Sequence, residues 1–264
     1  MEHEALIRLS IFLGLFTLFA SIETWFPRRV RSLPRKSRWF TAWSLTLLNT
    51  LTLRMMAFVL PVLAVGAAAD ATHQGWGLLN LITLPAWFEL ILAVLILDFA
   101  IWLQHLITHK VPLLWRLHRV HHADRDIDVT TAIRFHPVEI ALSMLIKIAV
   151  VYALGPTAIA VIIFEIMLNG TAMFNHANMR LPAKVDQLVR MVLVTPDMHR
   201  VHHSVHRQEH DSNYGFALSI WDRMFNTYIA QPKAGHDKME IGLAWRDERP
   251  AKLGWSLWLP FQKK

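Results

Sequence analysis

The sequence predicts an all-α integral membrane protein with about four transmembrane helices, arranged as two hairpins, and a cytosolic helical cap rich in histidine. Two observations support this fold class. Of the 264 residues 54% are hydrophobic and the mean hydropathy is +0.32, which is too apolar for a typical soluble domain. The apolar residues form long runs, and the polar segments beside the later runs hold an ordered series of histidines.

Four apolar regions are long enough to enter or cross a bilayer, at about residues 5–25, 42–69, 86–103 and 138–168. The first lacks a basic start and a small-residue cleavage site, so we expect a retained helix and not a signal peptide. The last is interrupted by Gly155-Pro156, which predicts two helices joined by a tight turn.

Charge patterning sets the expected orientation. A cluster of arginine and lysine at residues 28–38 follows the first apolar run, and such clusters mark the cytoplasmic side of a membrane. Both histidine-rich regions then face the cytoplasm if the last apolar region returns to the side from which it started. The formal charge is +7, and because the basic residues flank apolar runs, we expect contact with lipid head groups and no nucleic-acid partner. One domain spanning residues 1–264 is the simplest organisation, and the short chain favours a bacterial inner membrane.

The histidines are spaced as metal ligands on helices. Positions i and i+3 or i+4 share a helix face, whereas neighbouring residues diverge. The doubled pairs His121-His122 and His202-His203 can therefore serve two different ions. The chain has no cysteine, so any metal must be held by nitrogen and oxygen, and neutral imidazole suits iron, zinc, copper and nickel. The candidate ligands are His105, His109, His118, His121, His122, His136, His176, His199, His202 and His203.

Three polar residues are candidates for orienting those imidazoles by hydrogen bonds. Asp98 precedes His105 by two helical turns on the same face, and Asp211 and Asn213 follow the last histidine cluster. Acceptors in such positions fix the tautomer of a ligating histidine. Alternatively, Asp98 packs helices together, and the other two form a turn before Tyr214-Gly215.

Several motifs together resemble one family. The histidine clusters read H-x-x-x-H, H-x-x-H-H and H-x-x-H-H. Between and after them come Arg134-Phe135-His136-Pro137-Val138-Glu139, Phe174-Asn175-His176-Ala177-Asn178, Asp211-Ser212-Asn213-Tyr214-Gly215 and the segment from Trp221 to Tyr228. This order resembles the membrane di-iron fatty acid hydroxylase/sterol desaturase superfamily over about Asp98 to Tyr228. Asn226 stands where that family usually has a glycine.

The resemblance implies an oxidoreductase that uses two iron ions and O2 to hydroxylate or desaturate a C–H bond of a lipid in lipid metabolism. It implies electrons from a separate protein of the cytochrome b5 or ferredoxin kind. The ten histidines above are the implied metal ligands, with His136 the tenth candidate because a His-Pro step at a helix start can instead be structural. No further catalytic or cofactor-binding residues are implied.

Two other functions fit parts of the pattern. A membrane metal-binding or transport protein would place its ligands near the middle of the spanning helices, whereas these histidines follow the spans. A zinc-dependent lipid hydrolase would need a glutamate base beside the ligands, and between His105 and His109 lie only Leu106, Ile107 and Thr108.

Overall fold

The protein is described here from a computed structural model that covers residues 3–60 and 62–262. Within these ranges all regular structure is helical, and the extended segments pair only through isolated bridges. The α-helices are α1 (Glu4–Trp25), α2 (Arg35–Val59), α3 (Ala64–Gln74), α4 (Ala86–Lys110), α5 (Pro112–His122), α6 (Pro137–Leu154), α7 (Ala158–His176), α8 (Ala183–Val189), α9 (Pro196–His202), α10 (Arg207–His210), α11 (Ile220–Met224), α12 (Gly235–Lys238) and α13 (Leu253–Trp258). Short 3-10 turns are η1 (Leu78–Leu81), η2 (Val129–Ile133), η3 (Arg249–Ala251) and η4 (Leu259–Phe261).

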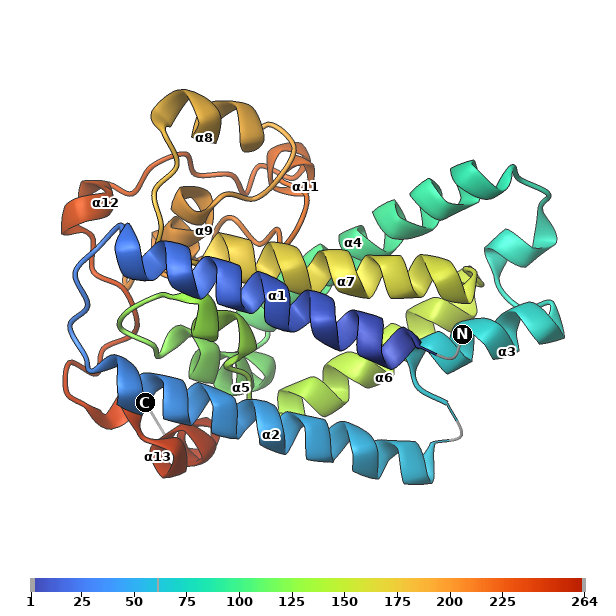
Figure 1. Ribbon diagram of the computed structural model, residues 1–264, viewed down its shortest axis with the longest axis horizontal. Coiled ribbons are helices and arrows are strands. Elements are labelled where there is room, and N and C mark those ends of the chain that lie inside the picture. The colour runs from blue at the N-terminus through green and yellow to red at the C-terminus, as the bar shows by residue number, and fades with distance from the viewer. Residues whose placement is uncertain (1–2, 61, 263–264) are drawn as a thin grey trace.

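The long helices form a bundle with the short helices gathered at one end. Helices α1, α2, α6 and α7 run lengthwise, and α4 crosses behind them (Figure 1). The end of α1, the start of α2 and helices α8, α9, α12 and α13 lie together at one end of this bundle, whereas α3 and the amino terminus lie at the other (Figure 1). The histidine-bearing helix α5 lies at the same end as the short helices, so the cap is assembled at one end of the bundle.

Five segments are long and apolar enough to cross a membrane, judged by length and composition. They are Glu4–Trp25, Arg35–Leu81, Ala86–Lys110, Pro137–Leu154 and Ala158–His176. The predicted break at Gly155-Pro156 is confirmed, because α6 ends there and α7 begins after it. The protein is therefore an integral membrane protein of helical type.

Proline fixes where three of the cap-facing helices begin. Pro112, Pro137 and Pro196 occupy the first turn of α5, α6 and α9. Proline lacks an amide hydrogen and has a helical φ, so it is favoured at this position, where the N–H would have no helical partner. At α9 the Oγ of Thr195 also accepts a hydrogen bond from the Met198 amide at 3.4 Å.

Two turns require unusual backbone angles. Gly77 and Gly155 both have positive φ, and a Cβ on Gly77 would lie 2.3 Å from the Gly155 nitrogen, so the two turns can approach only as glycines. Asn226 has φ of 55°, in the left-handed region that glycine and asparagine adopt most readily. This explains how asparagine serves where the superfamily that the motifs resemble usually has glycine.

The basic cluster after α1 is largely engaged in the fold. Arg38 is 1% exposed, and its guanidinium donates to Asp124 at 2.7 and 2.8 Å and to Asp128 at 2.5 Å. Both aspartates follow His122 in sequence. Arg38 therefore ties the start of α2 to the chain that leaves the second histidine cluster.

Buried Glu23 makes a similar connection from the end of α1. One carboxylate oxygen accepts from Arg35 at 2.9 Å, and the other accepts from the amides of Val129 at 2.9 Å and Asn178 at 3.1 Å. Asn178 follows the histidine at the end of α7 by two residues. The ends of α1, η2 and α7 are thereby held at fixed positions around the histidines.

Candidate metal centre

Nine of the ten candidate histidines come together in two sets. Their ligand atoms lie within 4.8 Å of one another in each set, and every member is buried. The first set is His105, His109, His118, His122 and His202, and the second set is His121, His176, His199 and His203. Each doubled pair is divided between the sets, as expected from the divergence of neighbouring side chains on a helix.

Four helices supply these side chains. Helix α4 carries His105 and His109, and α5 carries the cluster from His118 to His122. Helix α7 ends at His176, and α9 with its C-cap residue supplies the last cluster. Each set therefore draws on several segments that are far apart in sequence, which makes its geometry a property of the folded chain.

The second set has the spacing of ligands around an ion. The Nε2 atom of His176 lies 3.1 Å from Nε2 of His121, 3.1 Å from Nε2 of His199 and 3.3 Å from Nε2 of His203. A neutral imidazole carries one ring proton, and the Nδ1 atom of His176 faces the Ala172 carbonyl at 2.7 Å. Metal–nitrogen bonds of about 2.1 Å would separate neighbouring ligand atoms by about 3.0–3.4 Å, so an ion fits this set better than hydrogen bonds do.

The first set also fits a bound ion. The Nε2 atoms of His105 and His118 are 3.1 Å apart. The Nε2 atoms of His109, His122 and His202 are buried and have no hydrogen-bond partner in the described part of the chain. Buried polar atoms normally have a partner, and a metal coordinated by these nitrogens would provide one.

Protein acceptors hold several rings by Nδ1 and leave Nε2 for the ion. In the first set Nδ1 of His105 lies 2.7 Å from the Tyr214 carbonyl, and Nδ1 of His202 lies 2.6 Å from the Ser212 carbonyl. A carbonyl oxygen can only accept, so in each case Nδ1 is the donor and Nε2 is the unprotonated ligand atom. The Tyr214 amide and the Gly215 amide in turn donate to Asp222, each at 2.9 Å.

Burial keeps the cap histidines neutral. It lowers the pKa of His121, His122, His199, His202 and His203 well below the ordinary value, and neighbouring histidines lower it further. A neutral imidazole is the form that binds a metal. These residues therefore do not need to lose a proton before they bind an ion near neutral pH.

Glu139 is a partner of the site that the sequence did not reveal as such. Its Oε1 atom lies 2.6 Å from Nδ1 of His118, which is the carboxylate–histidine arrangement found behind many metal ligands. The residue was visible in the Arg134–Glu139 motif, but its partner lies on another helix.

Replacing Glu139 by alanine is expected to weaken metal binding at the first set by 10–100-fold, because His118 then loses the acceptor that fixes its tautomer. Chelator competition on the purified protein measures this affinity. Glu240→Ala is the matched control, since that carboxylate is 66% exposed. Equal affinities for the two variants would contradict a role for Glu139 behind the ligand.

His136 lies apart from both sets. It is the N-cap residue of α6, where Nδ1 accepts from the Val138 amide at 3.2 Å and Nε2 lies 3.3 Å from the Leu257 carbonyl. Both ring nitrogens thus face backbone groups, which favours the structural alternative for this His-Pro step.

The change His136→Ala is expected to leave metal content unchanged and to cost about 1 kcal/mol of stability, as for the loss of other N-caps. Metal analysis together with a thermal melt in detergent checks both parts. Loss of a metal ion from the His136→Ala variant would contradict this interpretation and would indicate that His136 is a metal ligand.

The three expected orienting residues have different outcomes. Asp98 accepts from the Leu218 amide at 3.3 Å and from Nε1 of Trp221 at 2.8 Å, and no imidazole of the described residues bonds to it. The predicted hydrogen bond from Asp98 to His105 is wrong. The two residues share a face of α4, but seven residues separate them by about 10.5 Å along the helix axis. Asn213 is also corrected: it bonds the backbone of Met198 and Ile229. Asp211 lies beside the site, with Oδ1 3.5 Å from Nδ1 of His109, so its role stays a prediction.

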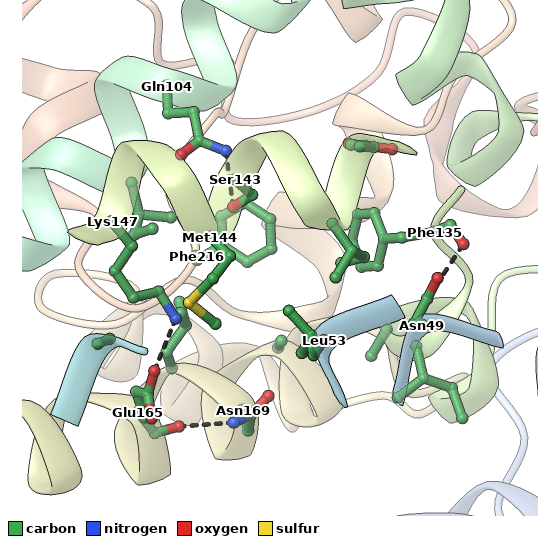
Figure 2. A pocket seen from close by; sticks show the side chains of 18 of the residues that line it. Asn49, Leu53, Gln104, Phe135, Ser143, Met144, Lys147, Glu165, Asn169 and Phe216 are labelled. Atoms are coloured by element: carbon green, nitrogen blue, oxygen red, sulfur yellow. Dashed lines mark hydrogen bonds and ion pairs between the residues drawn. The ribbon is translucent and has the colours of Figure 1, made fainter. Parts of the chain in front are cut away.

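A cavity of about 530 Å³ opens beside the first set. His105 and His118 contribute to its wall, together with apolar side chains from α2, α4, α6 and α7. Figure 2 shows Phe216 and Met144 in its middle, Asn49 and Phe135 on one side, and Lys147, Glu165 and Asn169 on the other. An elongated, mostly apolar molecule could lie in this cavity with part of it against the histidines.

Comparison with known proteins places the chain in a family. The fatty acid hydroxylase family profile matches residues 90–227, which include all the histidines of both sets. The chain belongs to this family.

Curated relatives are similar over the same region. Alkylglycerol monooxygenase from Homo sapiens is 28% identical over 178 residues, covering 64% of this chain and 36% of the relative. The Xenopus tropicalis enzyme of the same name is 29% identical over 166 residues, covering 59% and 34%. Ornithine lipid hydroxylase OlsE from Rhizobium tropici is 26% identical over 149 residues, covering 56% and 44%. The matched part thus spans between a third and a half of these relatives, and no solved structure matches the chain significantly.

Proposed function

We propose that the protein is an O2-dependent membrane di-iron oxygenase that hydroxylates or desaturates a C–H bond of a lipid. The observation that carries the proposal is the pair of histidine sets beside an apolar cavity, with His105 and His118 belonging both to the first set and to the cavity wall. The names of the relatives, a monooxygenase and a lipid hydroxylase, support the same class of reaction. Nitrogen-only ligation by imidazole is compatible with iron.

The residues of this chain would bind and orient the reactants. The first and second sets would each hold one iron, and the pair would supply the O2 chemistry that removes hydrogen from an unactivated C–H bond. The acceptors behind His105, His118 and His202 keep their Nε2 atoms directed at the ion. The apolar wall of the cavity would hold the lipid chain beside these residues and exclude water from the reacting carbon.

The same proposal places the cap on the cytoplasmic face. The basic segment between α1 and α2 and both histidine regions lie at one end of the bundle (Figure 1), and positive residues favour the cytoplasm. A separate cytochrome b5- or ferredoxin-like protein would deliver electrons to this face. The bacterial inner membrane is the proposed location.

The composition and the position of the two histidine sets argue against a zinc-dependent lipid hydrolase and against a membrane metal-binding or transport protein. Neither set contains an aspartate or glutamate, and the nearby carboxylate of Glu139 is engaged with His118, so a hydrolytic base is not provided in the way that zinc lipid hydrolases require. The histidines lie where helices meet the cap, away from the bundle middle that a transport path would use.

Turnover with isotope-labelled O2 tests the proposal. The purified protein, reconstituted with ferrous iron under argon, is given a membrane lipid extract, a reductant and labelled O2. The proposal predicts lipids that gain one labelled oxygen atom or lose two hydrogen atoms. His202→Ala should abolish this product, whereas His73→Ala, which changes an exposed residue on α3, should not. Equal product from both variants would contradict the proposal.

A further inference from the structure

Charged and polar side chains meet in the cavity well away from the histidines. We call Arg8, Lys147, Glu165 and Asn169 the Lys147 cluster; all four line the cavity. Lys147 lies eight residues beyond Glu139 on α6, about 12 Å along the helix axis. Glu165 lies eleven residues before His176 on α7, about 16 Å along the axis. One cavity therefore connects the Lys147 cluster with the first set of ligands.

The charges of this cluster are balanced once Glu4, which pairs with Arg8 outside the cavity lining, is included. Lys147 Nζ lies 2.8 Å from Glu165 Oε1, and Arg8 pairs with the other oxygen of Glu165 and, at 3.0 Å, with Glu4. Two cations thus face two carboxylates. An additional full charge on a ligand would remain uncompensated in a segment of the protein that crosses lipid, so the cluster favours a neutral ligand group.

The hydrogen bonds of the Lys147 cluster leave donors on Lys147 and an acceptor on Asn169 unused. An ammonium group has three donors, and Lys147 uses one on Glu165. Asn169 donates its side-chain amide to the backbone carbonyl of Glu165 at 2.8 Å, and its Oδ1 is an acceptor that this bond does not use. Spare donors beside a spare acceptor match a hydroxyl group, which can accept from Lys147 and donate to Asn169. Figure 2 shows Lys147, Glu165 and Asn169 close together on the same side of the cavity.

We propose that the Lys147 cluster binds an alcohol group of the lipid substrate. This inference rests on the proposed function. The lipid then lies with its hydroxyl at the cluster and with its reacting carbon roughly 12 Å away at the first set, the helical rise from Lys147 to Glu139, whose carboxylate contacts His118. Ionisable residues inside membrane segments are costly and are retained mostly for function. A clamp that only joined α1, α6 and α7 would have no need of an adjoining cavity.

Binding of radiolabelled hexadecanol to the iron-loaded protein without O2 tests the proposal, because no turnover takes place. Hexadecanol is expected to bind about tenfold or more tightly than hexadecane, since charge-assisted hydrogen bonds contribute that much or more. Lys147→Met should remove most of this preference while hexadecane binding stays unchanged. Lys184→Met is the matched control, because Lys184 is exposed on α8 outside the cavity.

A second variant separates binding from folding. Asn169→Leu removes the acceptor and leaves the ion pairs in place, and it should weaken hexadecanol binding several-fold. Equal binding of hexadecanol and hexadecane by the unchanged protein, or tighter binding of hexadecanoate, would overturn the proposal. Preferred binding of hexadecanol without any oxidised lipid in the turnover experiment would contradict the proposed function alone. Oxidised lipid without any preference for the alcohol would contradict this inference alone.

Discussion

His176→Ala is expected to remove one of two bound ions and to abolish turnover. The Nε2 atom of His176 lies within 3.3 Å of Nε2 atoms of three other histidines, so its loss opens the centre of the second set. The first set contains no atom of this residue and should keep its ion. Metal analysis of the purified variant should therefore give one ion per chain, with product formation below detection.

The matched control for this variant is His73→Ala, which removes an exposed histidine on α3. It should retain both ions and full product formation. A normal metal content in His176→Ala would show that the second set does not hold an ion in the way its geometry indicates.

Arg38→Met is expected to destabilise the protein by about 3–5 kcal/mol, the cost of removing one partner from a buried ion pair. The change leaves the buried carboxylates of Asp124 and Asp128 without their shared cation. Because both follow the second histidine cluster, the variant should also bind metal less tightly. Thermal inactivation in detergent and retained metal content measure the two effects.

Arg249→Met provides the comparison for an exposed pair. Arg249 and Asp247 are about half exposed, at 49% and 50%, and such pairs contribute at most about 1 kcal/mol. Similar thermal inactivation of Arg38→Met and Arg249→Met would contradict the role of Arg38 as the link between α2 and the histidine cap.

The sequence predicts local features of this protein well. Helical periodicity places His105 with His109 and divides each doubled histidine pair between two sets, because both results depend only on residues within one turn of helix. The long apolar runs and the break at Gly155 follow equally from local composition. The family resemblance also rests on such local motifs.

Contacts between distant segments are harder to predict. Glu139 meets His118 only after α5 and α6 pack together, and Asp98 and Asn213 bond backbone groups whose positions are set by the folded cap. The basic cluster at residues 28–38 was expected, from its place beside an apolar run, to mark the cytoplasmic side of the membrane. The burial of Arg38 depends instead on carboxylates about ninety residues later.

The most direct test of two ion sites is the iron content and Mössbauer spectrum of the detergent-purified protein after anaerobic reconstitution with ferrous iron. The nine histidines in two adjacent sets predict two irons per chain and, after oxidation, the spectrum of a coupled pair. One iron per chain or none after reconstitution, or two irons without coupling, would contradict a di-iron centre built from these residues.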